Sequence, residues 1–164
     1  MDSKRIARYA LLTALAMVLS WLESLIPVSG AVPGMKLGLT NLVVIFALER
    51  MRVRDAAVIS LVRVVLVSVT FGNAYSFAYS LAGAVLSLFV MVLLKKTGKF
   101  SVVGVSVAGG VCHNIGQILV AIAVLGTVRI AYYLPPLLVS GIAAGVAVGV
   151  AGGIVAKRVR YDGN

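Results

Sequence analysis

Six apolar segments separated by short polar loops make up most of this chain, and this pattern restricts its fold more than any other feature. Hydrophobic residues account for 61% of the 164 residues, and the mean hydropathy is +1.08, which excludes an ordinary soluble domain. We predict an all-α integral membrane protein, a single transmembrane domain over residues 1–164 with a bundle of six transmembrane helices. A simple span needs about 20 residues, so the second and third segments are short. The segments are approximately Ile6–Ile26, Leu37–Leu48, Ala56–Phe71, Phe77–Leu94, Val102–Leu125 and Leu134–Ala156.

The positive charges gather on one side of the predicted bundle. Of the 15 Lys and Arg residues, most fall at the two chain ends or in the loops after the second and fourth segments; the exceptions are Lys36, Arg63 and Arg129. Since cytoplasmic loops are enriched in Lys and Arg, both termini are expected in the cytoplasm, with the protein in the cell membrane. The net charge of +10 follows from this rule and indicates no nucleic-acid partner. It favours contact with anionic membrane lipid.

Small residues form flat faces on two of the predicted helices. In the last segment a glycine recurs at every fourth position, which predicts close packing against a neighbouring helix. In the first segment Ala10 and Ala14 form a similar pattern near the cytoplasmic end. This second face is expected either to pack within the bundle or to dock another membrane protein. The glycines are Gly141, Gly145, Gly149 and Gly153.

Arg63 places a permanent charge within the third apolar segment. Counted from Asp55 at about 1.5 Å per residue, it lies roughly 12 Å into the membrane, close to the midplane of a core about 30 Å thick. Charges at this depth are costly, usually face the bundle interior and often mark a substrate or ion path. Arg63 is therefore a candidate ligand-facing or gating residue. The alternative is a guanidinium satisfied by backbone carbonyls or by another helix.

Further polar residues lie in the predicted outer half. Lys36 follows a Pro-Gly turn at the start of the second helix, where a helix N-terminus favours an anion; a lysine snorkelling to the interface is the alternative. His113 and Gln117 share one helix face, with Asn114 beside them, which indicates either a pocket or a hydrogen-bond cluster between helices. Glu23 lies near the outer end of the first helix, and a carboxylate that reaches water is one of two interpretations left open there.

If these side chains converge, they form a cationic, hydrogen-bonding cavity that is open to the outside. Such a cavity favours a ligand with a phosphate, a carboxylate or a polar ring. The predicted substrate-binding residues are Lys36, Asn41, Arg63, His113, Asn114 and Gln117.

Several short runs carry a resemblance to a known membrane family. The most specific are the Lys-Leu-Gly-Leu run within Pro33-Gly-Met-Lys-Leu-Gly-Leu-Thr-Asn41 and the run His113-Asn-Ile-Gly-Gln117. Together with the Arg63 helix, Ser101-Val-Val-Gly-Val-Ser and Tyr133-Leu-Pro-Pro136, they resemble the Gx transporter family, also labelled heptaprenyl diphosphate synthase component I. The resemblance covers most of the chain.

This family looks similar to the substrate-binding S components of energy-coupling factor (ECF) transporters, which are six-helix proteins for vitamin uptake. In those proteins a small-xxx-small motif on the first helix contacts a transmembrane coupling subunit, which works with two ATPases. The resemblance implies that Ala10 and Ala14 dock such a partner.

The synthase label finds no support in the residues. Elongation of prenyl diphosphates needs Mg²⁺ held by clustered carboxylates, whereas the five acidic residues of this chain are scattered. No P-loop for ATP hydrolysis is present, one His beside one Cys makes no metal site, and no intramembrane aspartate completes a Ser-His-Asp set. We therefore expect no catalytic residues, no bound metal and no cofactor.

Two functions fit these observations. The first is a subunit that binds a small, anionic or vitamin-like solute from outside and is reoriented by a partner ATPase complex. The second is a non-catalytic membrane subunit of isoprenoid or quinone biosynthesis, or of flavin-linked redox machinery. A structural membrane protein without a ligand is a third interpretation, and the pocket geometry separates it from the other two.

Overall fold

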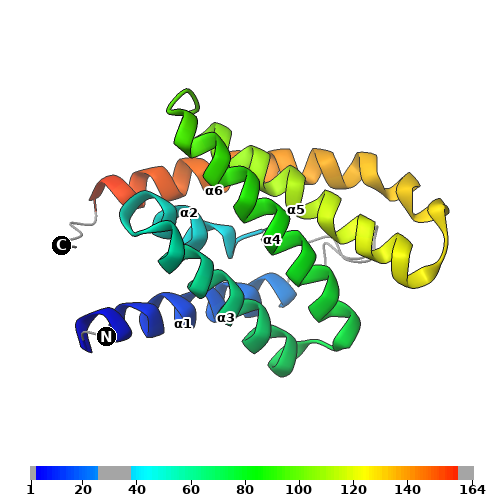
Figure 1. The fold of residues 1–164 in the computed structure, drawn as a ribbon, viewed down its shortest axis with the longest axis horizontal. Coiled ribbons are helices and arrows are strands. Elements are labelled where there is room, and N and C mark those ends of the chain that lie inside the picture. Colours follow the sequence, from blue (N-terminus) through cyan, green and yellow to red (C-terminus); the bar gives the residue numbers. More distant parts are fainter. Residues whose placement is uncertain (1–2, 26–37, 159–164) are drawn as a thin grey trace.

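The computed structural model describes residues 3–25 and 38–158. Within these ranges the chain forms six α-helices and one short 3₁₀-helix, and it contains no strand (Figure 1). The prediction of an all-helical protein is confirmed. The elements are α1 (Ser3–Leu25), α2 (Asn41–Arg50), α3 (Val53–Phe71), α4 (Ala74–Thr97), α5 (Val102–Leu125), η2 (Val128–Tyr133) and α6 (Leu134–Arg158).

Within the described residues, four stretches of helix are long and apolar enough to cross a membrane, as a multi-pass membrane protein requires. They are Arg5–Glu23, Ala74–Thr97, Val102–Leu125 and Val128–Arg158. The other two helices differ from these in length or in charge. α2 has 10 residues, and the 19 residues of α3 include Arg54, Asp55 and Arg63.

The short helix α2 lies at the centre of the bundle. It packs against α6, α3, α5 and α1, and every residue from Val43 to Leu48 is buried. A helix that is apolar on all sides is buried, either among other helices or in a membrane. Around it, α5 packs along both α4 and α6, while α3 packs against α4 and α1. α2 therefore touches both α3 and α5, the helices that carry most of the predicted binding residues.

Glycines bring α5 into backbone contact with its two neighbours. A Cβ atom added to Gly145 of α6 would lie 2.6 Å from the Cα atom of Val107, and one added to Gly116 of α5 would lie 2.8 Å from the Ala82 carbonyl oxygen of α4. The close packing predicted for the glycine face of α6 is confirmed at its first three positions. Gly153 differs, because its nearest neighbour would be a side-chain atom at 3.8 Å.

Basic side chains donate hydrogen bonds to carbonyl groups at helix ends on one side of the molecule. In Figure 1 the start of α1, the turn between α2 and α3, and the end of α6 all lie at the left, whereas η2 lies at the right. Arg50 Nε of α2 donates a hydrogen bond to the Ala156 carbonyl of α6 at 2.5 Å. Lys95 of α4 donates to the Leu48 carbonyl and pairs with Glu49 at 3.0 Å. Because the last carbonyls of a helix lack internal partners and carry partial negative charge, these cations stabilise the helix ends.

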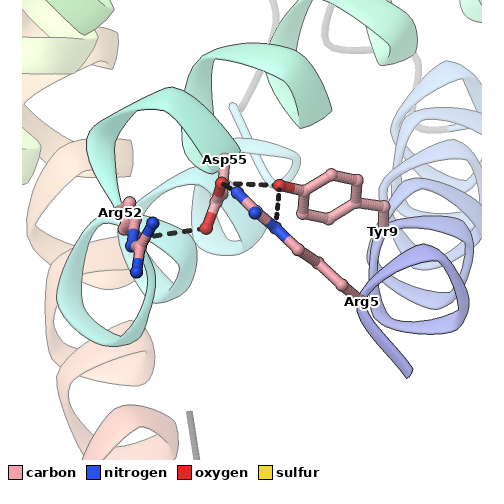
Figure 2. Close-up of polar contacts among 4 residues, drawn as sticks. All are labelled: Arg5, Tyr9, Arg52 and Asp55. Atoms are coloured by element: carbon pink, nitrogen blue, oxygen red, sulfur yellow. Dashed lines mark hydrogen bonds and ion pairs between the residues drawn. The ribbon is translucent and has the colours of Figure 1, made fainter. Parts of the chain in front are cut away.

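A polar cluster joins α1 to α3 on the same side (Figure 2). Asp55 Oδ1 accepts hydrogen bonds from Arg5 Nη2 and from the Tyr9 hydroxyl, each at 2.5 Å. Asp55 Oδ2 accepts the backbone N–H of Arg52 at 3.3 Å, which caps the start of α3. Burial would raise the pKa of the Asp55 carboxyl, but the hydrogen bonds from Tyr9 and Arg5 outweigh it and hold this pKa below its usual value. The ionised carboxylate thus links α1 to α3 at Tyr9 and Asp55.

Candidate ligand-binding site

Arg63 lies on the buried face of α3, together with Ser60 and Ser68. The residue is 8% exposed, and its Nε atom has no hydrogen-bond partner among the described residues. Burying a charge is costly unless it is paired and hydrogen-bonded, and an arginine has five N–H groups to satisfy. Arg63 is therefore a desolvated cation with unused hydrogen-bonding capacity, which favours the ligand-facing interpretation over that of a satisfied structural arginine.

Glu23 near the C-terminal end of α1 is buried as well. It is 9% exposed, and its Oε1 atom accepts a hydrogen bond from the backbone N–H of Gly38 at 2.5 Å. Gly38 has a φ of +76°, a conformation that glycine adopts without strain, so the turn before α2 can present this N–H to the carboxylate. The charge of Glu23 also attracts Arg63 electrostatically. This burial excludes the interpretation of Glu23 as a solvated carboxylate.

The polar residues of α5 face different neighbours. Asn114 is 4% exposed, and its Nδ2 atom donates a hydrogen bond to the Leu137 carbonyl of α6 at 2.6 Å. The ring of His113 lies against Gly83 of α4, where an added Cβ atom would come within 2.9 Å of the imidazole. Gln117 is also buried. Asn114 thus fastens α5 to α6, which is the interhelical role left open by the sequence, while a ligand contact for His113 and Gln117 stays a prediction.

The remaining predicted residues are Asn41, Lys36, Ala10 and Ala14. Asn41 is half-buried at the first position of α2, and its backbone N–H donates to the Gly38 carbonyl at 2.9 Å. Lys36 lies outside the described residues. Ala10 and Ala14 are exposed on α1, so the face predicted to dock a partner is accessible on this chain. The structure brings Arg63 near Glu23, and a single cavity lined by all six predicted residues stays a prediction.

The arrangement of ionisable side chains bears on metal chemistry too. Among residues 3–25 and 38–158, no three His, Cys, Asp or Glu side chains are grouped so that they would hold a metal ion.

Helix lengths, buried charges and glycine-mediated packing define the class of this chain as a multi-pass helical membrane protein. Residues 12–155 match the family model described as heptaprenyl diphosphate synthase component I, and the chain belongs to this family. No curated protein and no solved structure gives a significant match.

Proposed function

We propose that this chain is a membrane substrate-binding subunit, similar to an ECF S component, for the uptake of a small anionic or vitamin-like solute. A separate complex, a transmembrane coupling subunit with two ATPases, would supply the energy. The observation that carries the proposal is Arg63, a nine-tenths buried guanidinium whose Nε has no hydrogen-bond partner among the described residues. An anionic group bound there would satisfy both its charge and its donors.

The proposed topology has six spans with both termini in the cytoplasm. In this topology α2 is the central and shortest crossing. In support, the basic residues at the start of α1, between α2 and α3, and at the end of α6 lie on one side of the bundle (Figure 1). The predicted binding residues then belong to the outer half, and the basic side faces the cytoplasm and the ATPases.

A second candidate function follows from the description of the family. A component of a heptaprenyl diphosphate synthase would be a non-catalytic membrane subunit that holds a lipid-like anion or an enzyme partner. Native mass spectrometry of the gently purified protein separates the two candidates. A retained vitamin-like solute or coupling subunit supports uptake, whereas a retained prenyl or quinone species with a biosynthetic partner supports the second function.

Replacement of Arg63 by alanine is expected to weaken binding of the retained solute at least about 30-fold, because the loss of a buried charged partner typically costs 2 kcal/mol or more. The helical fold should be kept, since Arg63 Nε makes no hydrogen bond among the described residues. Titration calorimetry on the folded fraction measures the first effect, and circular dichroism measures the second. Arg54→Ala is the matched control, because this exposed arginine begins the same helix. Normal binding by the folded fraction of Arg63→Ala would make Arg63 a structural residue.

Replacement of Ala10 by tryptophan is expected to block assembly with the coupling subunit and to leave solute binding unchanged. The reason is steric, because close helix packing in a membrane needs small residues at the interface. Copurification of the partner from membranes measures the effect. Leu11→Trp is the control, since Leu11 is an exposed neighbour on an adjacent face of α1. Equal assembly of the two variants would remove the docking role of Ala10.

A further inference from the structure

Glu23 and Arg63 are two opposite charges that the fold buries on neighbouring helices. Both residues are at least nine-tenths buried, and α1 packs against α3. The contact between Tyr9 and Asp55 sets the level of the two helices, which begin at the same side of the bundle. Both residues lie beyond this contact along their helices, Glu23 fourteen residues after Tyr9 and Arg63 eight residues after Asp55.

The two charges attract each other without a hydrogen bond between them. Glu23 Oε1 instead accepts the N–H of Gly38, and Arg63 Nε has no partner among the described residues. Glu23 therefore offsets the charge of Arg63 but leaves donors of the guanidinium unused. This arrangement differs from a closed ion pair, in which the donors of the arginine would be consumed.

We propose that Glu23 is the internal counter-ion of Arg63, whose place an anionic solute takes when it binds. The proposal rests on the proposed function in one respect, namely that Arg63 is the residue an anionic solute meets. It names the substrate class more narrowly: the solute must bring a compact anionic group, because a neutral solute leaves Glu23 as the better partner. Glu23 also links the site to the turn before α2 through Gly38, so a solute at Arg63 changes the charge that this turn contacts.

The test is a double-mutant cycle on the empty protein, with inorganic phosphate as the probe anion. Thermal unfolding is measured in buffers of equal ionic strength, made with gluconate or with phosphate. Phosphate should raise the melting temperature of wild type only slightly, because Glu23 competes with it for Arg63. Glu23→Gln should melt several degrees lower in gluconate, because Arg63 loses its counter-ion, and phosphate should restore most of the loss. The double variant Glu23→Gln/Arg63→Gln should melt above Glu23→Gln in gluconate and should not respond to phosphate.

A control variant and a second comparison keep this test decisive. Glu49→Gln removes a carboxylate paired with Lys95 at the basic side, and it should not create a phosphate response. If Glu23→Gln does not fold, the double variant is compared with Arg63→Gln. A double variant that folds again supports the counter-ion role. Phosphate-independent melting of Glu23→Gln, or a double variant as unstable as the sum of both single variants, would overturn it. If the double-mutant cycle shows no coupling but native mass spectrometry finds a retained anionic solute, only the role of Glu23 is refuted. If the cycle shows the expected coupling but no solute is retained, only the uptake function is refuted.

Discussion

Replacement of Gly145 by alanine is expected to force α5 and α6 apart and to lower the free energy of unfolding by about 3 kcal/mol. The new Cβ atom would lie 2.6 Å from the Cα atom of Val107 and 3.1 Å from the Ser106 carbonyl oxygen. These are backbone atoms of a helix, so neither can rotate away as a flexible side chain would. Part of the cost is offset, because alanine favours the helix by up to about 1 kcal/mol over glycine. Unfolding in mixed micelles by SDS titration, followed by circular dichroism, measures the difference.

Gly153→Ala is the matched control, since it makes the same substitution on the same helix. Its new Cβ atom would meet only the Val102 side chain, at 3.8 Å, which is an ordinary van der Waals distance. This variant should therefore be as stable as wild type or more stable, by about 0.5–1 kcal/mol from helix propensity alone. Equal losses for Gly145→Ala and Gly153→Ala would contradict the close approach of α5 and α6.

The long helices could be predicted from the sequence because local signals fix their limits. α5 spans Val102–Leu125 as predicted, with Ser101 as its N-cap and Gly126 after its last residue. α3 begins at Val53, three residues before the predicted start, because the side chain of Asp55 caps a polar first turn that hydropathy alone does not mark. The short helix α2 shows the limit of hydropathy. Its apolar run predicts a short membrane segment, but its central position depends on how the other helices pack around it.

The candidate site was predictable only where one residue carries the signal. Arg63 is conspicuous in an apolar segment, and its burial agrees with the predicted interior position. Glu23 stands near a helix end, and its carboxylate accepts a hydrogen bond from Gly38, which lies fifteen residues further along the chain. Asn114 and His113 are adjacent in sequence, yet Asn114 bonds to α6 and His113 lies against α4. Which helix each side chain contacts depends on how α4 and α6 pack against α5. The spacing of residues along α5 does not predict this packing.

Replacement of Asp55 by alanine is expected to loosen α1 from α3 and to cost about 2 kcal/mol of stability. The variant removes the acceptor shared by Arg5 and Tyr9 and also uncaps the first turn of α3 (Figure 2). Trp21, the only tryptophan, lies on α1, so its fluorescence reports the release of this helix. Asp55→Asn should lose less, because an amide oxygen can still accept hydrogen bonds but carries no charge. If Trp21 fluorescence and stability are unchanged in Asp55→Ala, the cluster does not hold α1.

The same carboxylate predicts how stability depends on pH. The pKa of Asp55 is lower in the folded protein than its usual value of about 4, so the folded state binds fewer protons at this group than the unfolded state does. Its contribution is therefore complete above the unfolded pKa, and it is lost as the pH falls through the lower, folded pKa. Between pH 7 and pH 5 the difference in stability between wild type and Asp55→Asn should stay constant. Below about pH 4 it should shrink, since protonation of Asp55 removes the charge that Arg5 and Tyr9 contact, and a difference that persists to pH 2 would contradict the ion pair as its source.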